Sequence, residues 1–154
     1  MSSPTPITIR VQDADFDAAA EVARLVAGRC DIGGVVNFIG YCRDEGGTLA
    51  ALELEHYPGM AEDELTRISV DAAARWPLLG LVVIHRYGRI RPGEQIVLVA
   101  CASANRRAAF EAADFLMDFL KSHAPFWKKE HRVDGSDGDW VDAKTTDAED
   151  LSRW

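Results

Sequence analysis

The order of strand-like and helix-like segments constrains the fold of this chain more than any other feature of its sequence. Two strand-like runs, 35–42 and 49–57, follow one another across the Gly-rich turn 44–47, with no helical pattern between them. This succession predicts a β-hairpin. It also breaks the regular strand–helix–strand alternation of a parallel sheet. The expected fold class is therefore α+β, with a largely antiparallel sheet flanked by helices.

The rest of the chain predicts three helices and several further strands. Apolar residues at helical spacing predict the helices, with Asp13 and Asp15 as candidate caps of the first one. The helices are expected at 16–27, 60–76 and 106–120, and the strands outside the hairpin at 7–11, 81–85, 95–103 and 140–143, with a terminal helical turn at 147–154. Exposed edges of such a sheet commonly pair with another chain, so we expect a homodimer or a partner protein.

Length and composition indicate one domain in the cytoplasm. The 154 residues are expected to form a single domain, 1–154, with a flexible lead-in at 1–6 and a C-terminal tail at 144–154. No apolar run approaches the about 20 residues that span a bilayer, and the N-terminus lacks a signal-peptide pattern, so no membrane association is expected. The three cysteines are widely spaced, as suits a reducing compartment.

The charge distribution argues against a nucleic-acid partner. The net charge is −8, whereas binding to a phosphate backbone requires a basic surface. Within this acidic chain, residues 84–110 hold five arginines and a single acidic residue, Glu94. This patch is either a site for a local anionic ligand or an ordinary solvated mixture of charges. No Cys-x-x-Cys pair and no His-x-x-x-His pair occurs, so a protein-held metal is not expected. No other cofactor is expected either.

The segment from Lys121 to Lys129 holds the residues most suited to catalysis. Lys121 lies near the C-terminus of the third helix, residues 125–127 (Pro-Phe-Trp) form a rigid apolar anchor, and two lysines follow directly. This arrangement could hold ammonium groups beside an apolar pocket. The alternative is that Lys121 is a solvated lysine on a polar stripe of the helix that also contains Asp118, followed by a core-anchoring loop and a surface lysine pair.

Two further positions are candidates for binding an anion. Asn105 and Arg106 stand between a buried strand and the start of a helix, where free backbone N–H groups and a guanidinium suit an anion, although Asn105 could simply cap the helix. Arg43 directly follows a strand. A bulge at Gly40 would be needed to bring Arg43 to the same face as Phe38.

Four long motifs carry a resemblance to a known family. They are Phe38–Asp44 (FIGYCRD), Leu54–Met60 (LEHYPGM), Ile84–Gly88 (IHRYG) and Met117–Glu130 (MDFLKSHAPFWKKE). On these motifs the sequence resembles the large, catalytic subunit of molybdopterin synthase, the MoaE family. The resemblance covers about residues 33–143, and the C-terminal Arg153-Trp154 is also similar.

The resemblance implies an enzyme that converts cyclic pyranopterin monophosphate into molybdopterin. In this family, sulfur comes from the thiocarboxylate on the C-terminal Gly-Gly of a small ubiquitin-like subunit, the MoaD family, and forms a dithiolene on the precursor. The implied fold is an α/β hammerhead. The implied assembly is a heterotetramer, in which a homodimer of the large subunit carries one small subunit at each end.

The resemblance also assigns site residues. Lys121 and Lys128 match the two active-site lysines. Substrate-binding or pocket-lining positions are matched by Arg43, Asn105, Arg106, Phe38 and Met117, and these are flanked by Tyr41, Cys42, Lys129 and Glu130. Asn105 departs from the family, which usually has a histidine there, and an asparagine cannot shuttle a proton near neutral pH. The 44–51 turn is also slightly shorter than the family pattern.

In the expected mechanism, Arg106 and Arg43 hold the phosphate of the precursor. Lys128 stabilises developing negative charge, and Lys121 acts as an acid–base or electrostatic catalyst. Two alternatives remain open. One is a non-catalytic docking module for a ubiquitin-like sulfur-carrier tail. The other is a persulfide-type sulfurtransferase that uses Cys42, although a cysteine in an apolar strand is usually an inert core residue.

Overall fold

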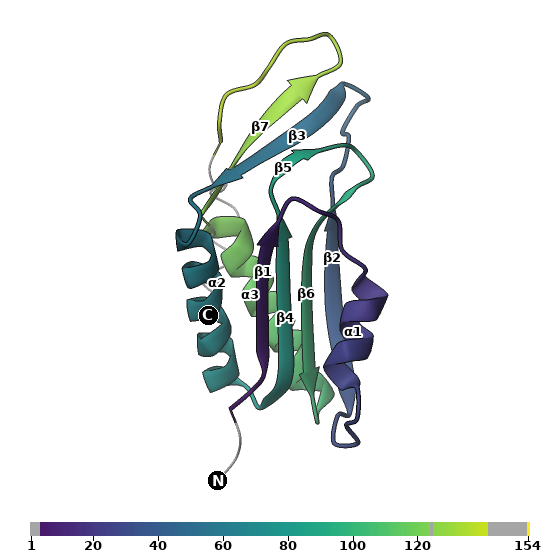
Figure 1. Ribbon diagram of the computed structural model, residues 1–154, viewed down its shortest axis with the longest axis vertical. Coiled ribbons are helices and arrows are strands. Elements are labelled where there is room, and N and C mark those ends of the chain that lie inside the picture. The colour runs from purple at the N-terminus through teal and green to yellow at the C-terminus, as the bar shows by residue number, and fades with distance from the viewer. Residues whose placement is uncertain (1–3, 124, 142–153) are drawn as a thin grey trace.

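The computed structural model describes residues 4–123, 125–141 and 154, which form two β-sheets and three helices (Figure 1). The strands are β1 (Ile7–Gln12), β2 (Gly34–Tyr41), β3 (Leu49–His56), β4 (Leu78–Arg86), β5 (Gly88–Ile90), β6 (Gln95–Ser103) and β7 (Phe126–Arg132). The helices are α1 (Ala18–Val26), α2 (Met60–Arg75) and α3 (Arg106–Ser122). The larger sheet has the order β1-β4-β6-β2 and the smaller sheet the order β5-β3-β7, so the predicted α+β class is confirmed.

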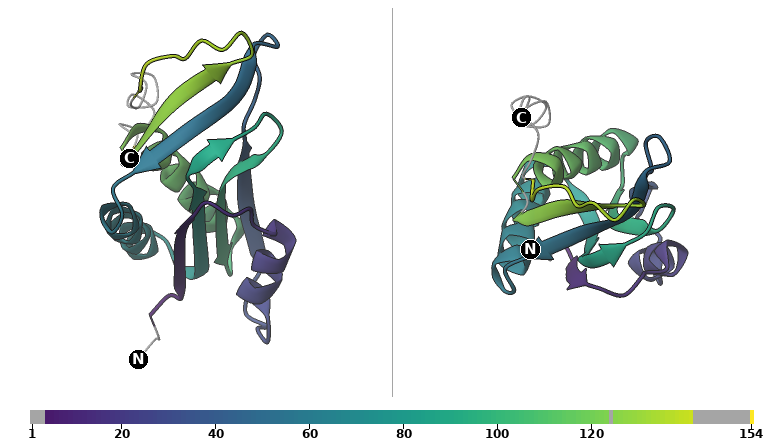
Figure 2. Two further views of the ribbon diagram at one scale, coloured as in Figure 1. Left: turned by 45° about the horizontal axis from the view of Figure 1, so that its top comes forward. Right: turned by 90° about the horizontal axis from the view of Figure 1, so that it is seen from above.

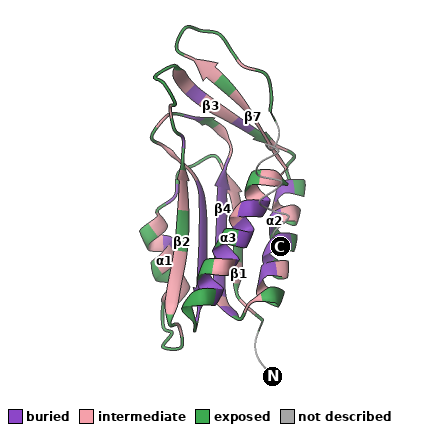
Figure 3. Ribbon diagram, turned by 180° about the vertical axis from the view of Figure 1, so that it is seen from behind, coloured by how far each residue is buried: buried purple, intermediate pink, exposed green. Residues whose placement is uncertain are grey.

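The larger sheet is antiparallel except for its β1–β4 pair. Helices α2 and α3 pack on one face and α1 packs on the other (Figures 1 and 2). The two central strands, β4 and β6, are buried along most of their length (Figure 3). Strands that are covered on both faces need apolar residues at every position, and such a continuous run explains why the predicted bounds of β6, 95–103, are confirmed.

The core is divided into one cluster on each face of the larger sheet. Residues at alternate positions of β4 and β6 point to opposite faces. The cluster under α2 and α3 includes Leu65, Ile68, Val83, Val99, Cys101 and Leu116, and the cluster under α1 includes Phe16, Val82, Ile84, Leu98 and Ala100. Each residue of β4 and β6 therefore points to a known face of the larger sheet, including the residues at the end next to the smaller sheet.

The hairpin predicted for 35–42 and 49–57 is wrong. β2 pairs with β6 in the larger sheet, whereas β3 pairs with β5 and β7 in the smaller one. The chain changes sheets because the end of β2 is tied to the β5–β6 turn. The amide of Cys42 donates to the carbonyl of Glu94, and the amide of Gly93 donates to the carbonyl of Cys42, both at 2.8 Å. These bonds occupy backbone groups that a hairpin would need.

The smaller sheet lies across one end of the larger sheet (Figures 1 and 2), which is the hammerhead arrangement that the resemblance implied. A small buried cluster of Cys42, Leu54 and Ile90 joins the two sheets. Strand β7 was not predicted, because five of its seven residues are polar. It forms because it pairs with β3 along its length, and such pairing overrides weak local propensity.

Some local predictions were wrong or fall outside the described residues. Helix α1 is capped by Asp17, which accepts a hydrogen bond from the amide of Ala20 at 3.1 Å, and not by Asp13 or Asp15. In the strand predicted at 140–143, Val141 forms only an isolated bridge, and residues 142–143 lie outside the described part. The predicted turn at 147–154 also lies outside it, except for its last residue. Within the described residues, no helix is long and apolar enough to cross a membrane.

Candidate functional site

Helix α3 carries predicted site residues at both of its ends. Asn105 caps its N-terminus by accepting a hydrogen bond from the amide of Ala108 at 2.8 Å, and Arg106 is its first residue. Lys121 lies in its last turn. With a rise of about 1.5 Å per residue, the step from Arg106 to Lys121 corresponds to about 22 Å. One copy of the chain therefore does not present both side chains to the same small substrate.

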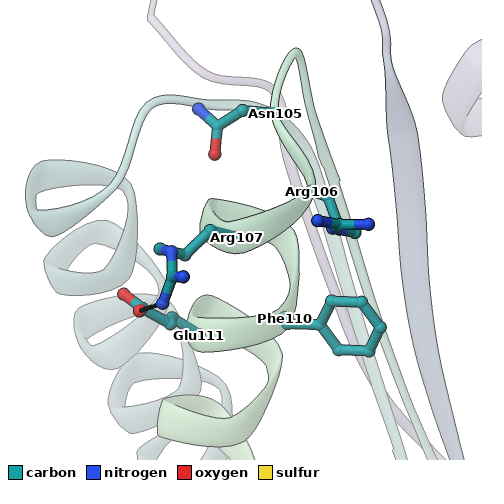
Figure 4. A pocket seen from close by; sticks show the side chains of 5 residues that line it. All are labelled: Asn105, Arg106, Arg107, Phe110 and Glu111. Atoms are coloured by element: carbon teal, nitrogen blue, oxygen red, sulfur yellow. Dashed lines mark ion pairs between the residues drawn. The ribbon is translucent and has the colours of Figure 1, made fainter.

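An open hollow of about 460 Å³ lies beside the N-terminus of α3 (Figure 4). It is lined by Asn105, Arg106, Arg107, Phe110 and Glu111. Arg107 and Glu111 lie on one side of the helix and form an ion pair of 3.6 Å, whereas Arg106 and Phe110 lie on the other side (Figure 4). The pairing partly neutralises Arg107, so the exposed Arg106 is the guanidinium better placed to meet an anion at this end.

Lys121 lies at the opposite end of α3, beside the junction of the two sheets. Its side chain is exposed, and its charge contributes to lowering the pKa of the buried imidazole of His85 near the end of β4. Phe126, the first residue of β7, stacks on that imidazole with ring centroids 3.9 Å apart. The stacked rings join the end of β4 to the start of β7, and the electrostatic effect of Lys121 on His85 indicates that the end of α3 lies near them.

Strand alternation places Lys128 and Lys129 on opposite faces of the smaller sheet. Lys128 pairs with Leu54, whose side chain belongs to the buried cluster between the sheets, so Lys128 lies on the inner face. Lys129 lies on the outer face. Its Nζ is 3.7 Å from a carboxylate oxygen of Asp137 and 5.6 Å from the ring centroid of Trp140. Of the two lysines, Lys128 is therefore the one directed toward the larger sheet.

Phe38 and Met117 lie on the same side of the larger sheet. Phe38 is opposite Val99, and Val99 belongs to the cluster on which the half-buried Met117 packs. A Cβ at Gly40 would lie 3.3 Å from the ring of Phe38 and 2.7 Å from a side chain of β6, so glycine is needed for this close packing. The predicted bulge is confirmed, because the register with β6 shifts between Gly40 and Tyr41.

Cys42 is buried, and its environment opposes ionisation. Its Sγ donates to the carbonyl oxygen of Ile90 at 3.8 Å. Burial and then the charge of Glu94 raise the pKa of the thiol. A thiol with a raised pKa stays protonated, which argues against a nucleophilic Cys42. The charge of Glu130 also raises this pKa, which places Glu130 near Cys42 at the sheet junction.

Tyr41 and Arg43 flank Cys42 and are both exposed. Arg43 forms an ion pair with Glu45 on the surface. Tyr41 is the last residue of β2, and Cys42, which stands between the two, packs with Leu54 and Ile90 of the smaller sheet. Tyr41 and Arg43 therefore belong to the end of the molecule that holds Lys121 and Lys128, and not to the end that holds the hollow.

Sequence reasoning missed three residues at the sheet junction. His85 stacks on Phe126, which also lies 5.8 Å from His56, and His56 lies 4.4 Å from Tyr87, all between ring centroids. We call these four residues the ring stack. The sequence signal was that His56, His85 and Tyr87 lie within two of the motifs that carry the family resemblance, 54–60 and 84–88. Within the described part of the chain, no group of three or more His, Cys, Asp or Glu side chains could hold a metal ion.

The fold and the site together define a class of protein. It is an α+β protein in which a lysine at a helix end and a lysine from a crossing strand lie at the junction of two sheets. Residues 11–123 match the family described as MoaE protein, and the chain belongs to this family.

Named relatives and solved structures agree with this assignment. The chain is 66% identical to the molybdopterin synthase catalytic subunit of Mesorhizobium japonicum over 154 residues, which cover 100% of this chain and 97% of the relative. The structure of the molybdopterin biosynthesis MoaE protein from Burkholderia ambifaria matches with a TM-score of 0.83 at 48% identity, covering 96% of this chain and 97% of that one. Molybdopterin synthase from Staphylococcus aureus matches with a TM-score of 0.73 at 28% identity, covering 92% and 98%.

Proposed function

We propose that this chain acts as the catalytic, large subunit of a molybdopterin synthase. It transfers sulfur from the C-terminal thiocarboxylate of a small ubiquitin-like subunit to cyclic pyranopterin monophosphate and so forms the dithiolene of molybdopterin. The names of its close relatives support this function. The structural observation that carries it is the placement of Lys121 and Lys128, from two different elements, at the junction of the sheets.

The two lysines have the chemistry that sulfur transfer requires. Attack of the thiocarboxylate sulfur on a precursor carbon forms an acyl–sulfur-linked intermediate and puts negative charge on the oxygen that leaves that carbon. The ammonium group of Lys128 stabilises this charge, and Lys121 supplies or accepts the proton. Water then cleaves the acyl–sulfur bond, so the sulfur stays on the precursor and the small subunit leaves as a carboxylate. A second small subunit delivers the second sulfur.

The precursor's phosphate is bound by arginines. Arg43 lies at the lysine end of the same chain. Arg106 lies about 22 Å from Lys121 along α3, which is too far for both to contact one precursor molecule. A site that contains both therefore uses two copies of the chain, as in a homodimer in which the N-terminus of α3 in one copy approaches the lysines of the other. Asn105 uses its oxygen in the helix cap, which leaves its amide hydrogens for the ligand.

We also place residues 1–154 in one domain and in the cytoplasm. The three cysteines are all free thiols: Cys30 is exposed, and Cys42 and Cys101 are buried. Free thiols suit a reducing compartment, where disulfides rarely persist.

The decisive experiment is a Lys121→Ala variant, assayed with purified thiocarboxylated small subunit and the precursor. We expect molybdopterin formation to fall by on the order of 100-fold or more, because a positioned acid–base group typically contributes that much. Arg24→Ala is the matched control, since it removes an exposed cation from α1 on the opposite face of the larger sheet. A yield near that of the unmodified protein in Lys121→Ala would refute the assigned role.

Asn105 is the residue that favours a second candidate function. Where the family usually has a histidine, this chain has a residue that cannot transfer a proton near neutral pH. The second candidate is a docking module that binds the tail of the sulfur carrier without catalysis. The same purified mixture separates the two functions. Binding of the small subunit without any molybdopterin would favour docking, and turnover would exclude it.

A further inference from the structure

We propose that His85 is a positioning residue for the sulfur-transfer site, because its ring fixes Phe126 and thereby sets where β7 presents Lys128 relative to Lys121. This inference rests on the proposed function of the two lysines. The role proposed for His85 is indirect. It acts through the stacked ring at the start of β7.

The orientation of the His85 ring is fixed on two sides. Its side chain is only 8% exposed. Nδ1 lies 2.8 Å from the carbonyl oxygen of Arg86. Since a carbonyl can only accept, Nδ1 carries the hydrogen, and this defines the tautomer. His85 is opposite Val97 in β6, and Val97 belongs to the cluster under α2 and α3. The ring therefore projects on the face of the larger sheet that α3 covers.

The ring stack then connects the larger sheet to the smaller one. Phe126 lies nearly parallel to the His85 ring, with an interplanar angle of 14°. In the smaller sheet, Phe126 of β7 is paired with His56 of β3, so the two side chains lie on the same face. His56 in turn contacts Tyr87. An aromatic pair of this kind is worth about 1 kcal/mol beyond its buried area. The start of β7 is thus held between residues of both sheets.

The position of Phe126 determines the position of Lys128. The two residues lie two positions apart on one strand, so they share a face and are separated by about 7 Å. Lys121 lies in the last turn of α3, and Phe126 begins β7 only a few residues further along the chain. A shift of the Phe126 ring therefore moves β7 relative to the end of the helix, and with it the spacing of the two ammonium groups.

The imidazole suits this place because it carries no charge at neutral pH. Burial, and then the charges of Lys121 and His56, lower the pKa of His85 to about 4. A cation in this position would repel Lys121, whereas a neutral ring packs against Phe126 and leaves the lysines as the positive groups of the site.

Two substitutions at His85 separate positioning from chemistry. His85→Ala removes the ring under Phe126, and we expect kcat for sulfur transfer to fall by on the order of 10- to 100-fold, since small displacements of catalytic groups have effects of this size. His85→Phe keeps an aromatic ring but has no nitrogen, and we expect kcat within about threefold of the unmodified protein. Affinity for the small subunit should stay unchanged in both. The control is Val83→Ala, which truncates a buried side chain two positions earlier on the same strand and on the same face.

The outcome is decided by comparison of these variants. Unchanged kcat in His85→Ala overturns the proposal, and so does an equal loss in His85→Phe and His85→Ala, because the imidazole nitrogen would then act directly. If His85→Ala does not fold, Phe126→Leu tests the same contact from the other side and should lower kcat to a similar extent. Molybdopterin formation by the unmodified protein tests the proposed function separately, so failure of one is distinguished from failure of the other.

Discussion

Acidification should destabilise the folded chain through His85. Burial is the main reason that the pKa of this residue falls from 6.5 to about 4 on folding. Between these two values the unfolded chain binds a proton at His85 and the folded chain does not. The free energy of unfolding therefore falls as the pH falls through this window, and the full contribution of His85 is present only above about pH 6.5.

The size of the effect follows from the two pKa values. A difference of one pKa unit corresponds to about 1.4 kcal/mol. The fall in pKa from 6.5 to about 4 therefore corresponds to about 3 kcal/mol of the free energy of unfolding. About 2 kcal/mol of this is already lost at about pH 5. This loss is large beside the total stability of a typical domain, which is about 5–15 kcal/mol.

The measurement is urea denaturation followed by circular dichroism at about pH 7.5, 6 and 5. His85→Phe has no titratable group at this position, so its stability should fall by about 2 kcal/mol less than that of the unmodified protein between the highest and lowest of these values. Aspartates whose pKa is lowered, such as Asp31 and Asp137, are common to both proteins and cancel in the difference. Val83→Ala should be less stable at every pH and keep the original slope. Parallel slopes for His85→Phe and the unmodified protein would refute the reasoning.

Three further substitutions test other parts of the structure. Gly33→Ala should lower the free energy of unfolding by about 2 kcal/mol or more, because its Cβ would lie 2.1 Å from the carbonyl oxygen of Ala104. The measurement is thermal denaturation, and the control is Gly34→Ala, whose Cβ would meet open space. Trp154→Ala should cost about 2 kcal/mol in the same measurement, since the indole makes ring contacts with Trp76, directly after α2, and with Phe115 in α3. Cys42→Ala should keep sulfur transfer near the original rate, and loss of turnover in a folded variant would restore the persulfide mechanism.

The sequence predicted long segments with one dominant pattern, because local and tertiary preferences agree there. β6 was predicted with its observed bounds, and α3 was predicted to within two residues at its C-terminus. The hairpin was wrong because a Gly-rich turn at 44–47 shows that the chain turns, but not which strand it pairs with afterwards. That choice depends on the bonds between Cys42 and the distant turn at Gly93 and Glu94.

The residues of the site could be named from the sequence, but their surroundings could not. Asp118 was expected on a solvated stripe of α3, yet it is buried, and its carboxylate accepts a hydrogen bond from the indole of Trp154. No local periodicity reveals a contact across 36 positions. The assignment of Lys128 and Lys129 to opposite faces likewise required knowing that β7 is a strand. The catalytic roles of these residues stay predictions.

The length of α3 has a consequence for how defects in this protein would combine. If Arg106 at one end of the helix completes a site built around Lys121 of the other copy, each active site contains residues from both chains. A mixed dimer of one Arg106→Ala chain and one Lys121→Ala chain then carries both lesions in one centre and neither in the other. Two inactive chains would restore function when mixed, with about a quarter of the original activity for random pairing. Because α3 keeps Arg106 and Lys121 of one chain far apart, the activity of each chain thus depends on the residues of the other chain in the dimer.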